Sequence, residues 1–197
     1  GIVIGVAAAT SNARSILIAG LSGTLAGMIS MCMGEYVSVS TQKDSQKMAL
    51  ISEKQRLQNQ YQHEFDYVQK KYEAQDIDPQ LAKQATKELM EKDALGTAVQ
   101  ERYGFNPNEF TSPYAAAIAS FISFPTGSIL PMVAVTVSPA NVRILATAIA
   151  VLIALLITGY FAAVLGKSNR IKSMIRNAAA GLLTMGVTYL IGQLFAR

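Results

Sequence analysis

The sequence predicts an all-α membrane protein with five transmembrane helices, the first of them partial, and a cytosolic helical insert between the second and the third. The chain has 197 residues, of which 51% are hydrophobic and 15% charged, whereas soluble domains carry about 25% charged residues. The charge is also uneven, because 12 of the 13 acidic residues lie between Lys43 and Glu109. Several apolar runs approach or exceed the roughly 20 residues that cross a bilayer as a helix.

The chain begins with an apolar run, residues 1–9, that is about half a membrane span. We expect this run to be the end of a first span whose beginning lies upstream. A short polar turn, residues 10–14, separates it from a second span over residues 15–40. Gly23 and Gly27 in this second span have the GxxxG spacing that lets another helix approach closely.

One stripe of the second span carries sulfur and a carboxylate. Its members, spaced at i, i+3, i+4 and i+7, are Met28, Met31, Cys32 and Glu35. Glu35 lies about 12 Å of helix before Lys43, so it sits at the edge of the hydrocarbon layer. An ionisable group at that depth usually faces a partner, a cavity or a permeation path. Packing is the alternative, because methionine fills irregular gaps and a free cysteine behaves as a small hydrophobe.

Residues 42–112 form a polar insert that is predicted to be helical. Apolar residues recur there at intervals of three, four or seven from Leu50 to Tyr72, and no proline lies between Gln42 and Gln75. The second span therefore continues into water without a break. The pattern alone favours a solvated charged face over a metal site.

A second amphipathic helix is predicted from Pro79 to about Tyr103. Asp78 is a good N-cap and Pro79 suits the first helical position. Gly104 is placed to end the helix.

Three further apolar spans follow the insert, at Pro113–Val137, Ile144–Leu165 and Asn177–Ala196. The first of them contains Pro125 and Pro131, which predict a kink or an interruption near its middle. Such broken helices expose backbone carbonyl groups as ligands in several transporters.

The segment between the last two spans carries four cations and no acid, which marks it as cytoplasmic under the positive-inside rule. The cations are Lys167, Arg170, Lys172 and Arg176. Counting back through the spans places the insert on the same side. We therefore divide the chain into residues 1–41 with spans 1 (partial) and 2, the cytosolic insert 42–112, and residues 113–197 with spans 3 to 5.

Composition also limits the chemistry of the chain. The single cysteine excludes an intrachain disulfide, and one cysteine with one histidine gives no zinc pattern. The net charge of +4 lies beside the membrane spans, so it does not imply nucleic acid. We expect no enzyme activity and no resident cofactor.

The string from Ala26 to Ser40, AGMISMCMGEYVSVS, with the residues Gln42 to Asp44 after it, resembles the second helix of the vacuolar iron transporter family. The segments Glu88–Met90 and Asp93–Gly96 are similar too, and the resemblance covers essentially the whole chain. It implies a homodimer of five-span subunits that exports ferrous iron or manganese from the cytosol in exchange for protons. It also implies that the insert is a three-helix metal-binding domain.

Carried over to this chain, the resemblance assigns Met31 to the transport pathway, and Met28 and Glu35 share its stripe. It implies metal ligands in the insert at Glu53, Glu64, Met90 and Asp93. Three positions depart from the plant members, which have Glu, Glu and Met there; they are Arg56, Tyr67 and Leu89. We therefore expect the insert to bind fewer ions, and more weakly, than a complete site.

Mixed ligation by carboxylates and thioethers favours a transition metal over magnesium or calcium. Glu53 and Glu64 would stand about 16 Å apart along an unbroken helix. They can meet one ion only if the chain turns between them, near Asn59, or if a second subunit contributes. His63 is expected at the surface, and Met90 and Asp93 are expected to share a helix face.

These observations predict a transporter of ferrous iron, with manganese as the second candidate, that works by proton antiport. The expected partners are the divalent metal ion, protons, the lipid bilayer and a second copy of the chain, with no nucleic acid. We expect a bacterial plasma membrane as the location, with which the lack of a transit segment in this sequence is compatible. The alternative is a membrane-anchored dimer whose insert binds a partner helix or senses metal without transporting it.

Overall fold

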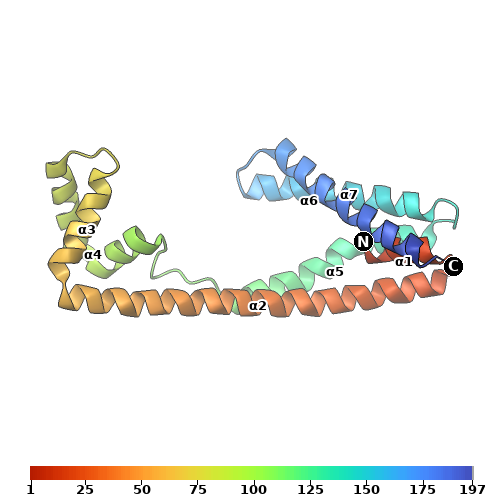
Figure 1. Cartoon of the computed structure of the whole chain (residues 1–197), viewed down its shortest axis with the longest axis horizontal. Coiled ribbons are helices and arrows are strands. Elements are labelled where there is room, and N and C mark those ends of the chain that lie inside the picture. Colours follow the sequence, from red (N-terminus) through yellow and green to blue (C-terminus); the bar gives the residue numbers. More distant parts are fainter. Residues whose placement is uncertain (197) are drawn as a thin grey trace. The chain divides into compact units, whose positions relative to one another are not determined.

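The computed structural model describes residues 1–196, and over this range it consists of seven helices without a strand (Figure 1). The predicted all-α class is thereby confirmed. The helices are α1 (Ile2–Ala9), α2 (Ala13–Asn59), α3 (Tyr61–Glu73), α4 (Pro79–Tyr103), α5 (Pro113–Val137), α6 (Arg143–Leu165) and α7 (Arg170–Leu194). Among these, α2, α5, α6 and α7 are long and apolar enough to cross a membrane. Helix α1 has eight residues and is shorter than a span.

Two compact units make up the chain. The bundle unit consists of Gly1–Met33 and the chain from Ile118 onward, and the insert unit is Gly34–Ala117. Helix α2 contributes to both units. Each unit has its own packing and is described by itself.

Helix α2 has 47 residues, so the second span does continue into polar sequence without a break. At its start, Asn12 Oδ1 accepts a hydrogen bond from the amide of Ser15 at 3.1 Å. The helix ends at Asn59, because Gln60 leaves the helical region with φ −145° and ψ 48°. The proline-free stretch to Gln75 is therefore not one helix. The chain turns after Asn59, near the position where a turn was required to bring Glu53 and Glu64 together.

In the insert unit, helices α3 and α4 pack against each other after this turn. Val68 of α3 and Ala98 and Val99 of α4 are fully buried in their contact. The Tyr72 hydroxyl donates to Glu101 Oε1 at 3.1 Å beside them. Burial, together with the negative charge of Glu101, raises the pKa of Tyr72 to about 12.

Both predicted caps of α4 are present. Asp78 Oδ1 accepts from the amide of Gln80 at 2.9 Å, and Gly104 has the left-handed φ of 74°. The helix is not regular throughout, because Asp93 has φ −155° and ψ 89°. The Asp93 carboxylate accepts from the amide of Gly96 at 2.8 Å, so this residue acts as an internal N-cap. A regular helical face shared by Met90 and Asp93 is therefore not formed.

Helix α5 runs from Pro113 to Val137 with Pro125 and Pro131 inside it. Of the predicted kink or interruption, an interruption is therefore not present. Proline removes an amide donor from the helix, and hydroxyl groups in the same turns supply other hydrogen bonds. Thr126 Oγ1 donates to the carbonyl of Ile122 at 2.7 Å, and Ser128 Oγ donates to that of Pro125 at 2.8 Å.

Helix α7 begins at Arg170, seven residues before the predicted Asn177. Asn169 caps it, because its Oδ1 accepts from the amide of Lys172 at 3.0 Å. Three of the four cations expected in a loop therefore lie in the first two turns of a helix.

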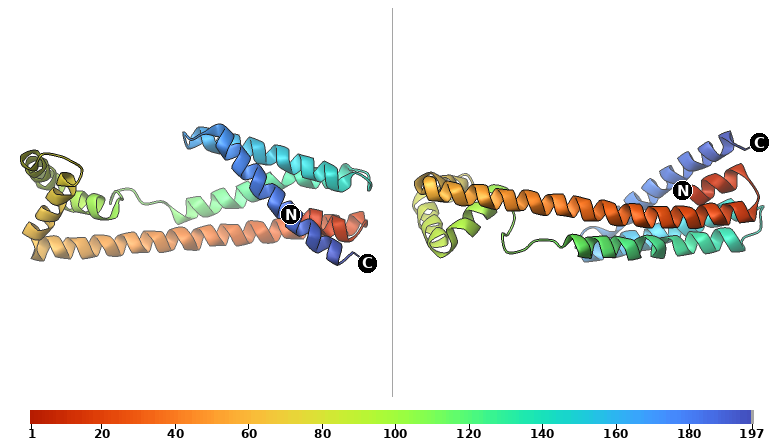
Figure 2. Two further views of the ribbon diagram at one scale, coloured as in Figure 1. Left: turned by 45° about the horizontal axis from the view of Figure 1, so that its top comes forward. Right: turned by 90° about the horizontal axis from the view of Figure 1, so that it is seen from below.

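In the bundle unit, α6 and α7 form an antiparallel hairpin, and α1 packs on both of them (Figures 1 and 2). The contacts use small residues such as Ala163, which is 1% exposed, and Gly159. Large apolar side chains point outward instead, and Leu183 is 71% exposed. This arrangement is typical of helices that pack within lipid.

The two glycines of the GxxxG spacing lie against side chains from two different helices. Gly23 faces the side chain of Ile2 on α1, whereas Gly27 faces the ring of Phe124 on α5. Close approach at the glycines is confirmed, but two helices use it rather than one.

We expect Gly192→Ala to destabilise the bundle unit. A Cβ at Gly192 would lie 2.9 Å from the Cβ of Ala8 and closer still to the carbonyl oxygen of Gly5, so the α1–α7 crossing would have to open. Overpacking of this kind costs about 1–3 kcal/mol. Thermal unfolding of the detergent-solubilised protein should show a lowered midpoint.

The matched control is Gly186→Ala on the same helix, where a Cβ meets no atom of the described residues within 4 Å. This change should leave the midpoint unchanged or raise it, since alanine is favoured over glycine in a helix by roughly 0.5–1 kcal/mol. Equal midpoints for the two variants would contradict the described crossing.

Candidate functional site

The stripe of α2 lies on uninterrupted helix, and its members differ in burial. Met28 and Cys32 are half-buried, whereas Met31 is 48% exposed and Glu35 is exposed. A methionine that fills a gap in its own core would be covered. Packing within this chain therefore does not account for Met31 or Glu35.

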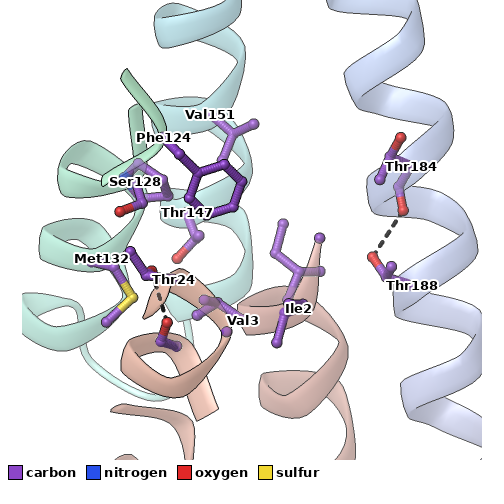
Figure 3. A pocket seen from close by; sticks show the side chains of 15 residues that line it. Ile2, Val3, Thr24, Phe124, Ser128, Met132, Thr147, Val151, Thr184 and Thr188 are labelled. Carbon is purple, nitrogen blue, oxygen red and sulfur yellow. Dashed lines mark hydrogen bonds between the residues drawn. The ribbon is translucent and has the colours of Figure 1, made fainter. Parts of the chain in front are cut away.

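A pocket of about 370 Å³ lies within the bundle unit, between α1, α2, α5, α6 and α7 (Figure 3). Hydroxyl groups line it, and each donates its proton to a carbonyl of its own helix; they belong to Thr24, Ser128, Thr147, Thr184 and Thr188. Their oxygen lone pairs remain available, and Met132 adds one sulfur. Among the described residues that line the pocket, none has a charged side chain. The pocket is thus less suited to a divalent ion than the α2 stripe.

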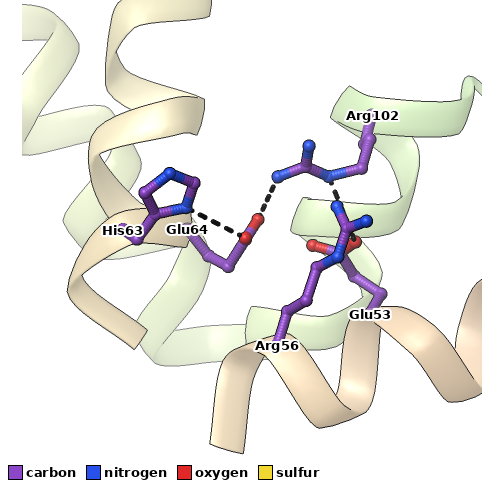
Figure 4. A network of polar contacts seen from close by, with 5 residues as sticks. All are labelled: Glu53, Arg56, His63, Glu64 and Arg102. Atoms are coloured by element: carbon purple, nitrogen blue, oxygen red, sulfur yellow. Dashed lines mark hydrogen bonds and ion pairs between the residues drawn. The ribbon is translucent and has the colours of Figure 1, made fainter. Parts of the chain in front are cut away.

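In the insert unit, the turn at Gln60 brings Glu53 of α2 and Glu64 of α3 together (Figure 4). Both side chains are buried, at 0% and 1% exposure. Arg102 of α4 lies between them. Its Nε is 3.1 Å from Glu53 Oε2, and its Nη2 donates to Glu64 Oε2.

Glu53, Glu64 and Arg102 form an ion triad. The side chains around this triad are also polar or aromatic. The guanidinium of Arg102 lies over the ring of Tyr67, 3.8 Å from its centroid. Arg56 Nη1 is 4.0 Å from Glu53 Oε2, with a side chain that is 45% exposed. His63 Nδ1 is 3.3 Å from Glu64 Oε1, and the side chain is 70% exposed, as predicted for a surface histidine.

The two carboxyl groups of the triad are not equivalent. Burial, together with the neighbouring Glu64 carboxylate, raises the pKa of Glu53 above its ordinary value, although Arg102 opposes this. Burial alone would also raise the pKa of Glu64, but hydrogen bonds from Arg102 and from its other neighbours outweigh it, so that pKa is lowered. Glu53 Oε2 faces Arg102 Nε without the alignment of a hydrogen bond. Glu64 is therefore the firmly ionised partner.

The other two expected ligands both belong to α4. Met90 is 3% exposed inside the α4 packing, and Asp93 lines a separate hollow with Tyr72 and Gln100. Within residues 1–196, no three His, Cys, Asp or Glu side chains are gathered in a way that could hold a metal ion. The structure thus brings Glu53 and Glu64 together but does not bring Asp93 to them.

Arg102 was missed by the sequence analysis, although a pattern for it exists. It follows the buried Val99 by three residues, and Glu64 precedes the buried Val68 by four. Charged residues at positions of the apolar stripe on two helices predict a buried ion pair, because an unpaired charge there is costly.

The fold and the α2 stripe define the class of the protein: a polytopic α-helical membrane protein with an additional helical unit of polar sequence. The family model described as the VIT family matches residues 1–193. The chain therefore belongs to the VIT family.

Several relatives match nearly the whole chain. A protein of Acanthamoeba castellanii named vacuolar iron transporter is 33% identical over 193 residues, which cover 98% of this chain and 74% of that protein. The vacuolar iron transporter homolog 2.1 of Arabidopsis thaliana is 29% identical over 189 residues, with 95% and 70% covered. The vacuolar iron transporter homolog 1 of Oryza sativa is 31% identical over 195 residues, with 98% and 66% covered.

The triad predicts different effects on the stability of the insert unit for two chemically similar variants. Glu64→Gln should lower the stability of the insert unit at neutral pH by about 1.5–3 kcal/mol, the contribution of a hydrogen bond to a charged group. Glu53→Gln should leave it unchanged or raise it, because glutamine resembles the protonated form that burial favours. Thermal unfolding followed by circular dichroism measures both, with the exposed Glu91→Gln as control.

The pH dependence has a defined sign. Because the pKa of Glu64 is lowered in the folded state, its stabilisation is complete above its unfolded pKa and is lost as the pH falls through the folded value. Glu53 contributes in the opposite sense, and its stabilisation is lost as the pH rises through its raised pKa. A greater loss of stability in Glu53→Gln than in Glu64→Gln at neutral pH would contradict the assignment of Glu64 as the firmly ionised partner.

Proposed function

We propose that this protein transports divalent transition-metal ions, with ferrous iron as the first candidate and manganese as the second, out of the cytosol in exchange for protons. The observation that carries the proposal is the pair Met31 and Glu35, which are exposed on a membrane-spanning helix. The names of the relatives, vacuolar iron transporters, support iron as the transported ion.

The chemistry of the stripe fits this cargo. A thioether adds little for magnesium or calcium but binds softer ions such as ferrous iron, and a carboxylate supplies negative charge. Met31 would be the soft ligand, with Met28 on the same stripe. Glu35 would bind the ion and a proton in turn, as an exchanger requires. The pocket of the bundle unit has no charged side chain among its described lining residues, so it offers no group that could bind the ion and a proton in turn.

The exposure of the stripe supports a homodimer. From its spacing to Lys43 we expect Glu35 at the edge of the hydrocarbon layer, where an ionisable group without a partner costs a few kcal/mol. A second copy of the chain that covers α2 would shield Met31 and Glu35 and would place the pathway between subunits. Symmetric dimers are the commonest oligomers.

The side of the membrane follows from charge. The cations of the α6–α7 connection and the start of α7 favour the cytosol. With the spans alternating in direction, the insert, residues 42–112, is then cytosolic, between residues 1–41 and 113–197. Its acidic and basic residues would meet the ion before it enters the membrane.

We expect Met31→Ala and Glu35→Gln each to reduce metal flux by about 10- to 100-fold. Loss of a residue that only supports a metal ligand already lowers metal affinity or activity by this factor. The assay uses the full-length protein in proteoliposomes, anaerobic ferrous ion and an imposed pH gradient. Met33→Ala is the matched control, since Met33 is exposed on the same helix but lies off the stripe.

Wild-type flux in both stripe variants would overturn the pathway assignment. Metal binding without any flux that depends on the pH gradient would instead favour the alternative, a membrane-anchored metal sensor.

A further inference from the structure

Arg102 contacts three groups of two kinds, two carboxylates and one aromatic ring. Its guanidinium contacts the carboxylate of Glu64 and lies 3.1 Å from that of Glu53 (Figure 4). It also stacks over the ring of Tyr67, 3.8 Å from the ring centroid. The Arg102 side chain is only 17% exposed. An arginine that is packed on both carboxylates and an aromatic face is a fixed part of the interior.

The position of this guanidinium is the one that a bridging ion would need. Glu53 and Glu64 come from different helices, are almost completely buried and present their oxygens to one cation between them. Two buried carboxylates without a cation would repel each other and open the turn at Gln60. Arg102 supplies the cation from within the chain.

A divalent ion at the same place would meet two obstacles. It would have to displace the guanidinium from both carboxylates, and it would approach Arg56, whose Nη1 is 4.0 Å from Glu53 Oε2. Tyr67 offers it a ring face that suits a guanidinium and no carboxylate oxygen. The residues around the pair thus favour arginine over a metal ion.

We propose that Arg102 is a built-in counter-ion that takes the place of a metal ion between Glu53 and Glu64, so that α2, α3 and α4 close without metal. This inference goes beyond the proposed transport function and holds whether or not the protein transports metal. It assigns a structural role to a carboxylate pair that by spacing alone resembles a metal site.

The test is amide hydrogen exchange of the full-length protein in nanodiscs, with either a chelator or manganous ion. Peptides that cover Glu53 to Val68 and the end of α4 should be protected in the wild type to the same degree in both conditions. In Arg102→Gln with chelator, their exchange should become faster by about 100-fold or more, the factor that corresponds to removing one partner of a buried ion pair. Manganous ion should restore protection, because the carboxylate pair is then free for it.

Two further variants separate this role from a general loss of folding. Lys87→Gln removes one positive charge from the same helix at an exposed pair with Glu91, and it should behave as the wild type. The double variant with Glu53→Gln and Arg102→Gln removes the repulsion between the carboxylates, so it should regain protection in chelator and respond little to manganous ion.

Three results would overturn the proposal. They are protection that depends on metal in the wild type, full protection of Arg102→Gln in chelator, and exchange in Arg102→Gln that neither metal nor the second substitution slows.

Discussion

The uninterrupted hydrogen-bond ladder of α2 is the constraint on which both compact units depend. Its 47 residues pass from apolar to polar sequence without a proline or a break. Within the bundle unit its glycines admit side chains from α1 and α5, and within the insert unit it carries Glu53 to the turn at Gln60. One helix can serve both units because the backbone bonds of a helix are satisfied in lipid and in water alike.

Much of this fold could be predicted from local patterns. The apolar runs predicted the four long spans, and Asp78, Pro79 and Gly104 predicted the ends of α4, because caps depend on neighbouring residues only. The stripe of Met31 and Glu35 could also be predicted, since helical spacing fixes which residues share a face.

The rest depends on contacts between segments far apart in the sequence. No residue type forces the break at Gln60; the burial of α3 against α4 accompanies it. The same holds for Asp93, which leaves the helix to cap Gly96. Arg102 is 49 residues from Glu53, so periodicity within one helix could not reveal that the expected ligands already have a cation. A pair of carboxylates that is neutralised by an arginine differs from a pair that binds a metal ion by a single residue, and that residue lies on a third helix.

The start of α7 shows how topology and helix stability can conflict. Arg170 and Lys172 lie in the first turn, where the helix dipole is positive and disfavours cations. Asn169 caps the turn, and Arg170 lies over the ring of Tyr160 at 5.4 Å, which offsets part of this cost. An acidic residue here would make a better isolated helix but would reduce the positive charge on which the proposed cytosolic side of this connection rests. In the proposed topology, the composition of this turn thus serves the orientation of the last two spans more than the stability of the finished helix.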